Sequence, residues 1–218
     1  LIVPRGGKGL IQTLVDNSKV PFILDGDGNV HLYIHGDAKK ENIIDIVVNS
    51  KVQRPGVCNA LETLLMNNEI YQDMGNEVIE ALLENGVELY VDEKIIQDFP
   101  NLNLANESHY ETEFLDLKLA IKLVDNVDEA IDHIKKYSSG HTEAILTESN
   151  KVSETFAKSI DSSVIFINSS TRFTDGEMFG FGSEIGISTQ KLHVRGPMGL
   201  EALTNERYVV TGEGTVRG

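Results

Sequence analysis

Helix-type and strand-type segments alternate along most of this 218-residue chain, and the alternation limits the folds open to it. Apolar residues recur every three or four positions in the helix-type segments, whereas the strand-type segments are short apolar runs. Beyond residue 77 the pattern predicts helices at 78–83, 93–98, 127–137 and 151–159 and strands at 87–91, 114–124, 143–147 and 164–168. Such alternation predicts an α/β fold, in which helices cover a sheet.

The first residues already resemble the middle of such a pattern. Apolar runs at 1–3 and 20–24 flank a helix-type segment at 10–15, as in a βαβ unit. No cap or start signal stands in front of the first run. We therefore expect a preceding region that this chain lacks.

Charge and composition exclude several classes of function. The chain has 19 basic and 34 acidic residues, and the resulting net charge of −15 repels a nucleic-acid backbone. It contains no run of 18 apolar residues, and its start lacks the order of a signal peptide. The sequence therefore predicts a cytoplasmic protein that binds neither nucleic acid nor a membrane.

Cys58 is the only cysteine, which excludes an internal disulfide and argues against a thiolate metal cluster. A helix that starts at Asp37 is expected to end before the Pro55-Gly56 turn. Residues 59–66 again have helical composition, so Cys58 would precede a helix whose free N–H groups, together with Arg54, stabilise a thiolate. The alternative, a small buried residue without a chemical role, stays open on the local sequence.

The segment 168–200 has a different character. It contains six glycines in 33 residues, against a usual share of about 7%, and is therefore expected to be rich in loops. Long loops that rest on a rigid sheet often carry binding and catalytic residues. Farther on, residues 207–216 have the pattern of a strand that pairs with another subunit.

Several motifs occur in an order that points to one family. They are VPRGG at 3–7, QRPGVCNA at 53–60, AIDHI at 130–134, YSSGHTE at 137–143, NSSTRFTDG at 168–176, GSEIGIST at 182–189 and HVRGP at 193–197. In these motifs the chain resembles the gamma-glutamyl phosphate reductases, which belong to the aldehyde dehydrogenase superfamily. The resemblance runs the whole length of the chain and implies the C-terminal half of such a protein.

The resemblance implies a domain organisation. We expect an aldehyde dehydrogenase-like catalytic domain with a remnant of the Rossmann-like cofactor domain. Residues 1–24 would end the cofactor-binding domain, 25–203 would form the catalytic domain, and 204–218 would be an oligomerisation strand or tail. A homo-oligomer is implied for the full-length protein, with most of the NADPH site in the absent half.

The implied reaction is the NADPH-dependent reduction of L-glutamate 5-phosphate to L-glutamate 5-semialdehyde and phosphate, a step of proline biosynthesis. The thiolate of Cys58 would attack the acyl phosphate, and hydride would then reduce the thioester. A glutamate kinase, which makes the acyl phosphate, is an expected partner. The alternative is a non-catalytic fragment, or an assembly module of a bifunctional glutamate kinase/reductase.

The resemblance also implies roles for single residues near the thiol. Glu113, with Phe114 beside it, is similar to the superfamily glutamate that holds the nicotinamide ribose. Asp25 stands near the place of a glutamate that activates water in hydrolytic relatives. A reductase does not need that base, so Asp25 is either a shortened remnant of it or a packing residue.

The substrate carries a phosphate and an α-carboxylate, which call for guanidinium or N–H donors. Arg172 and Arg195 are candidates for that role, and each has an alternative as a loop-anchoring ion pair. No metal site is expected. The predicted substrate-binding residues are Arg54, Asn168, Ser169, Arg172 and Arg195.

Overall fold

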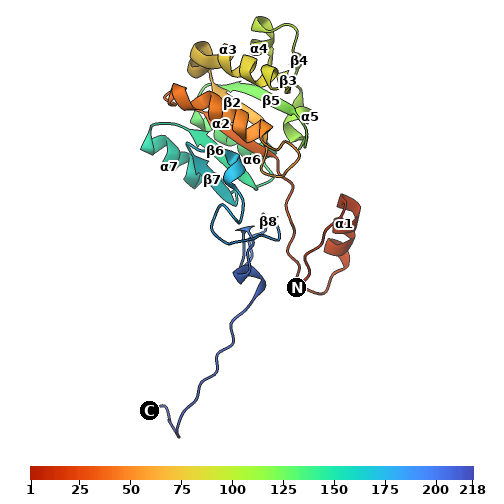
Figure 1. Ribbon diagram of the computed structural model, residues 1–218, viewed down its shortest axis with the longest axis vertical. Coiled ribbons are helices and arrows are strands. Elements are labelled where there is room, and N and C mark those ends of the chain that lie inside the picture. Colours follow the sequence, from red (N-terminus) through yellow and green to blue (C-terminus); the bar gives the residue numbers. More distant parts are fainter.

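The computed structural model describes the backbone of residues 1–218 and every side chain except that of Lys8. Its centre is a sheet of seven parallel strands in the order β4-β3-β5-β2-β1-β6-β7 (Figure 1). This arrangement confirms the predicted α/β fold. The strands are β1 (Val30–Ile34), β2 (Leu61–Asn67), β3 (Glu88–Val91), β4 (Asn103–Leu104), β5 (Lys118–Val124), β6 (Thr142–Leu146) and β7 (Val164–Ile167).

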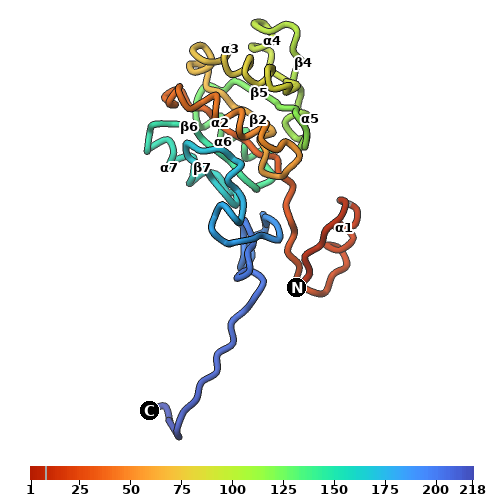
Figure 2. The backbone as a smooth tube through the Cα atoms, viewed as in Figure 1, coloured from red at the N-terminus to blue at the C-terminus, as the bar shows by residue number. Residues whose placement is uncertain are grey.

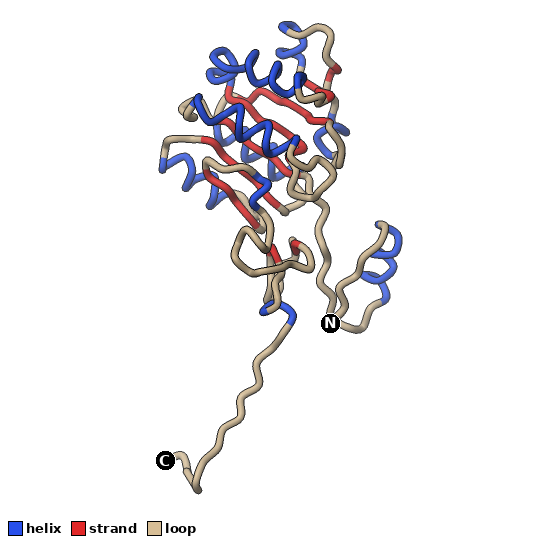
Figure 3. Tube along the Cα trace, viewed as in Figure 1, coloured by secondary structure: helices blue, strands red, loops and turns tan.

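Helices cover both faces of this sheet (Figure 3). On one face α2, α3 and α4 share a core with Leu64 and Met66 of β2, and on the other α6 and α7 pack around Leu65 and Ile145. Each crossover returns the chain to the edge where the next parallel strand begins. The helices are α1 (Lys8–Asn17), α2 (Lys40–Val52), α3 (Asn68–Glu84), α4 (Glu93–Asp98), α5 (Glu107–Glu111), α6 (Val127–Tyr137) and α7 (Asn150–Ser159), with 3-10 turns at Thr171–Phe173 and Glu201–Leu203.

The two central strands depart from the sequence-based expectation. The stretch 59–66, predicted to be helical, leads into strand β2, and β1 was not predicted. Every residue of both strands is buried. A short run that is buried on both faces has no alternating pattern, so its period does not distinguish a strand from a buried helix. The prediction that Cys58 precedes a helix is therefore wrong.

Two predicted boundaries also differ. Helix α2 begins at Lys40, and Asp37 accepts a hydrogen bond from the Thr147 hydroxyl at 2.6 Å without capping the helix. Strand β5 begins at Lys118, four residues later than predicted, because a turn occupies the preceding residues. Within that turn Leu115 has a φ of 52°.

Both ends of the chain lie outside the sheet and its helices (Figure 2). Ile2 and Phe22 form an isolated parallel bridge around α1, as the βαβ pattern predicted, and β8 (Ile187–Ser188) pairs with β9 (Gly196–Pro197). Residues 204–218 form an exposed extended tail. Its pairing with another subunit, and the domain limits at residues 24 and 203, stay predictions. Within the described part of the chain, no helix combines the length and apolar character that crossing a bilayer requires.

Candidate active site

Three segments meet at the amino-terminal edge of the sheet. Gly28 lies just before β1, Cys58 just before β2, and Glu113 shortly before β5. Because these strands are parallel and adjacent, the segments that lead into them arrive at the same edge. Open α/β sheets more often bind ligands at the opposite, carboxyl-terminal edge. The predicted nucleophile therefore lies at an edge that the general rule does not indicate.

Gly28 packs directly on the backbone of Cys58. A Cβ at position 28 would lie 1.7 Å from the carbonyl oxygen of Cys58, so no residue with a side chain fits there. The N–H of Gly28 donates to Oε1 of Glu113 at 2.7 Å. One glycine thus joins the predicted nucleophile to the predicted cofactor ligand.

The thiol of Cys58 is half-buried in a negative environment. Burial raises its pKa to about 12, and the charges of Asp25, Glu113 and Glu184 act in the same direction. The thiol is therefore protonated at neutral pH in this chain. The predicted activation by a helix N-terminus is wrong, because the residues after Cys58 lead into strand β2. The N–H groups of β2 form hydrogen bonds with the neighbouring strands of the sheet.

Arg172 lies within electrostatic reach of Cys58, on the turn Thr171–Phe173. Its Nε donates to Oε1 of Gln53 at 2.8 Å. Burial lowers the pKa of Arg172, and the positive charge of Arg54 lowers it further, although a guanidinium stays protonated. The structure thus brings together two of the predicted anion ligands, Arg54 and Arg172, near the thiol.

The segment that carries Arg172 runs from one edge of the sheet to the other. Asn168 follows β7 at the carboxyl-terminal edge, where its amide exchanges hydrogen bonds of 2.9 and 2.8 Å with the backbone of Thr147. The hydroxyl of Thr174 already lies 2.9 Å from that of Thr142, which begins β6 at the amino-terminal edge. Arg172 therefore reaches Cys58, whereas Asn168, with Ser169 next to it, stays near the other edge.

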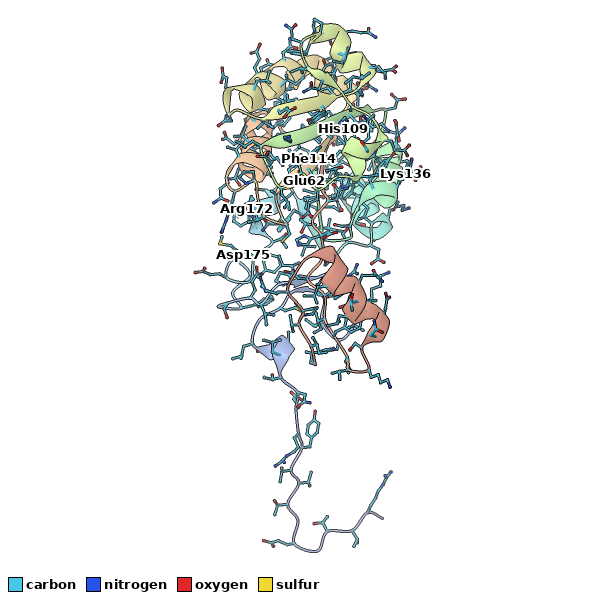
Figure 4. All side chains as sticks on the ribbon, turned by 90° about the vertical axis from the view of Figure 1, so that its right-hand side faces the viewer. Glu62, His109, Phe114, Lys136, Arg172 and Asp175 are labelled. Atoms are coloured by element: carbon cyan, nitrogen blue, oxygen red, sulfur yellow. The ribbon has the colours of Figure 1, made fainter. Side chains whose placement is uncertain are left out.

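A cleft of about 320 Å³ opens beside Arg172. Figure 4 shows Arg172 and Asp175 on the same side of the molecule, toward its C-terminal part. The lining combines a guanidinium, carboxylates, amides and apolar side chains, and it is made by Asn49, Gln53, Arg172, Phe173, Asp175, Glu177 and Met178. Its volume lies at the lower end of the range for small-molecule sites.

Arg195 and Phe114 make other contacts. Nη1 of Arg195 lies 2.7 Å from Oδ1 of Asp161, and its Nη2 donates to the Asp161 carbonyl at 2.6 Å. This is the loop-anchoring ion pair that was the alternative for this arginine. Phe114 stacks on Tyr90 with the ring centroids 5.6 Å apart.

Two carboxylates accept backbone N–H groups of the glycine-rich segment. Asp25 accepts the N–H of Ile187 at 2.9 Å and so joins that segment to residue 25, and Glu184 accepts the N–H of Gly176 at 2.8 Å. Burial raises the pKa of Glu184. Sequence reasoning did not single out Glu184 or Gly28. Both lie in glycine-rich motifs, but only the folded chain shows that they face Cys58.

Known proteins resemble the chain over its whole length, although no protein-family model matches it. The gamma-glutamyl phosphate reductase of Thermoanaerobacter pseudethanolicus is 50% identical over 217 residues, which cover 100% of this chain and 52% of that protein. The crystal structure of a gamma-glutamyl phosphate reductase from Thermotoga maritima is 48% identical and superposes with a TM-score of 0.93, over 99% of this chain and 52% of that chain.

A more distant structure shares the fold alone. An acetylating aldehyde dehydrogenase from Geobacillus thermoglucosidasius is 18% identical, with a TM-score of 0.74 over 99% of this chain and 57% of that chain. The chain spans about half the length of the curated relatives it matches. Over the half that it spans, the chain belongs to the gamma-glutamyl phosphate reductase family.

Proposed function

We propose that this chain supplies the nucleophile and part of the substrate site for the NADPH-dependent reduction of L-glutamate 5-phosphate to L-glutamate 5-semialdehyde in proline biosynthesis. One observation carries the proposal: the single cysteine lies within electrostatic reach both of Glu113, which accepts the N–H of Gly28, and of Arg172, which in turn lies within reach of Arg54. A thiol can take the acyl group while guanidinium groups hold the phosphate. The names of the relatives, gamma-glutamyl phosphate reductases, support the same substrate.

The first chemical step forms a thioester. The sulfur of Cys58 bonds to the acyl carbon, the bond from that carbon to the phosphate oxygen breaks, and inorganic phosphate leaves. The thiol proton passes to a neighbouring carboxylate, for which Asp25, Glu113 and Glu184 are candidates. Because burial and these charges raise the thiol pKa and oppose a free thiolate, we expect the proton to move as the sulfur–carbon bond forms.

The cleft beside Arg172 suits the rest of the substrate. An α-amino acid presents a carboxylate and an ammonium group, and the cleft offers a guanidinium and the carboxylates of Asp175 and Glu177. Arg54 and Arg172 are the proposed ligands for the anionic groups. Arg195, Asn168 and Ser169 were also predicted to bind substrate. We propose that Arg195 and Asn168 act by holding loops, because their polar groups already bond Asp161 and Thr147.

Glu113 is the residue of this chain that would hold the nicotinamide ribose. Its carboxylate is half-buried, lies within electrostatic reach of Cys58 and is fixed by the N–H of Gly28. A carboxylate suits this role because it accepts hydrogen bonds from hydroxyl groups. The stack of Phe114 on Tyr90 holds the same segment in place. NADPH, when bound, would supply the hydride that reduces the thioester.

Labelling by an acyl phosphate tests the proposal. Acetyl phosphate should add one acetyl group to the chain, detected by intact mass, and Cys58→Ser should stay unlabelled. Arg172→Gln should react about tenfold more slowly, because it loses a charge-assisted hydrogen bond to the phosphate. The matched control is Arg195→Gln, which removes a guanidinium held at Asp161 and should react at the native rate. A native chain that takes up no acetyl group would contradict the proposal.

An assembly module is the second candidate, and the exposed extended tail of residues 204–218, which leaves backbone groups free to pair with another chain, favours it. Such a module would bind a glutamate kinase, or complete a bifunctional kinase/reductase, without reacting itself. A chain that stays unlabelled by acetyl phosphate but binds a glutamate kinase in sedimentation would support this alternative. Acetylation at Cys58 would favour the enzyme.

A further inference from the structure

A buried ion pair closes the loop that carries Cys58. Nζ of Lys51 lies 2.8 Å from Oε2 of Glu62, and neither side chain is exposed to solvent. Lys51 lies in the last turn of α2 and Glu62 is the second residue of β2, so the pair joins the two ends of the intervening loop. Burying two charges is costly, and a hydrophobic pair could fill the same space. Packing alone therefore does not explain why Lys51 and Glu62 are charged.

Glu62 has a second partner, on the segment that carries Glu113. Its Oε1 accepts the N–H of Leu115 at 3.1 Å. With a φ of 52°, Leu115 lies in the left-handed region, which a residue with a branched side chain seldom adopts and which costs energy to hold. The carboxylate, fixed by Lys51, thus stabilises a backbone turn that is unfavourable by itself.

Leu115 is also next to the Cys58 loop. A Cβ built at Gly56 would lie 3.5 Å from the carbonyl oxygen of Leu115, an ordinary contact distance, so the two backbones are close together. Two residues before Leu115, Glu113 accepts the N–H of Gly28, which packs on the carbonyl of Cys58. In Figure 4 Glu62 is labelled next to Phe114, the residue before Leu115, as the hydrogen bond to Leu115 requires.

We infer that Glu62 is a positioning residue of the thiol site: its carboxylate, held by Lys51, fixes the turn at Leu115 and thereby the placement of Glu113 against the Cys58 loop. Glu62 acts through Leu115 and makes no contact with the thiol in this assignment. The inference rests on the proposed role of Cys58 as the nucleophile.

Two double variants isolate the bond from Glu62 to Leu115. Lys51→Met with Glu62→Gln removes both charges but keeps an oxygen that can accept the Leu115 N–H. Lys51→Met with Glu62→Leu removes the charges and the acceptor. Both variants remove the two buried charges together and leave neither charge without its partner, so both chains should fold, which circular dichroism would verify.

The readout is the rate of Cys58 alkylation by iodoacetamide as a function of pH, which is specific because the chain has a single cysteine. When Glu113 is no longer held against the loop, its charge opposes the thiolate less and the thiol pKa falls. We expect the Glu62→Leu chain to react about tenfold faster at pH 8, the change for about one pKa unit, and the Glu62→Gln chain to stay near the native profile. Equal profiles for the two double variants, at whatever rate, would overturn the inference.

Two further measurements distinguish a specific effect of Glu62 from a general loosening of the fold. Phe156→Leu trims the core on the opposite face of the sheet and should leave the alkylation profile unchanged; an equal acceleration would overturn the inference. In the native chain, hydrogen exchange at the Leu115 amide should be strongly slowed, and exchange at the rate of a free amide would also overturn it. Neither readout requires turnover, so failed acetylation of Cys58 would refute the proposed function by a separate result.

Discussion

Glu62 on β2 and Glu143 on β6 are both fully buried near the same edge of the sheet, but their charges are balanced differently. Glu62 faces α2 and meets a cation, the Lys51 ammonium, at 2.8 Å. Glu143 faces α6 and accepts hydrogen bonds from the backbone N–H of His31 at 2.9 Å and from the hydroxyls of Ser138 and Ser162. The ring Nδ1 of His31 lies 3.2 Å from the same carboxylate.

The difference shows how strongly each carboxylate depends on a single partner. Glu143 is stabilised by several local dipoles that connect β1, β6 and the turn after α6, so the loss of one donor leaves the others in place. Glu62 depends mainly on one cation from another element. An ion pair that joins the ends of a loop can position that loop. It is also easier to break than a set of several hydrogen bonds, because one substitution removes the partner.

Removing the cation should have the largest effect. Lys51→Met leaves the Glu62 carboxylate buried without its partner and should lower the free energy of unfolding by about 3–5 kcal/mol at pH 8. Burial already raises the pKa of Glu62 to about 7, so the loss should shrink at pH 5, where this carboxyl is protonated. Urea denaturation at both pH values measures it. As a control, Lys158→Met breaks an exposed pair with Glu154 and should change the free energy of unfolding little. An equal loss in this control would contradict the prediction that burial makes the Lys51 pair different.

Changing the dipole-stabilised carboxylate should cost less. Glu143→Gln keeps one acceptor oxygen but turns an amide N–H₂ toward groups that donate, and the loss should be about 1–3 kcal/mol in the free energy of unfolding. Alkylation of Cys58 should keep its native pH profile, because the hydrogen-bond partners of Glu143 are His31, Ser138 and Ser162 and not Gly28, Cys58 or Glu113. A shifted profile would remove the distinction between the two glutamates.

Acid should destabilise the chain through its buried histidines. Burial lowers the pKa of His133 to about 2 and that of His141 to about 4, against an ordinary value of 6.5. The unfolded chain therefore takes up protons first, and the contribution of these histidines is lost as the pH falls below about 6.5, by up to about 1.4 kcal/mol per pH unit for each. Urea midpoints between pH 7 and pH 5 should fall less steeply for His133→Phe than for the native chain. Parallel slopes would contradict a neutral buried His133.

The smallest effect should come from removing both charges of the ion pair. Lys51→Met with Glu62→Leu should change the free energy of unfolding at pH 7 by about 1 kcal/mol or less, because apolar side chains replace the buried pair. The raised pKa of Glu62 means that the native chain gains stability from this group as the pH falls from about 7 to about 4.5, and the double variant should lack that gain. Matched denaturation curves at pH 5 and pH 7 test both points, and a loss as large as that of Lys51→Met alone would show that the pair itself stabilises the fold.

Local patterns predicted some elements well. Helix α6 runs from Val127 to Tyr137 as expected, because its apolar stripe and the cap at Asn126 are properties of neighbouring residues. Strands β1 and β2 were missed or misassigned because both their faces are buried, which erases the alternation that marks a strand. The misassignment of β2 also produced the wrong expectation of a helix N-terminus at Cys58.

The candidate site divides in the same way. The motif around Cys58 and Arg54, and the segment with Arg172, were identified from the sequence, and the fold brings them together. Asn168 lies seven residues before Asp175 in the chain, yet its amide bonds Thr147 at the other edge of the sheet. Glu62 carried no signal, because a glutamate inside an apolar run reveals its partners only when Lys51 and Leu115 are in place.

The sequence by itself determined the alternation of helices and strands, the single thiol and the family, because these are read along the chain. Only the tertiary structure decided the state of that thiol. Its raised pKa comes from burial and from Asp25, Glu113 and Glu184, which lie in three segments far apart in the sequence. Electrostatic effects depend on distances through space, and only the folded chain sets those distances by bringing the three segments together around Cys58.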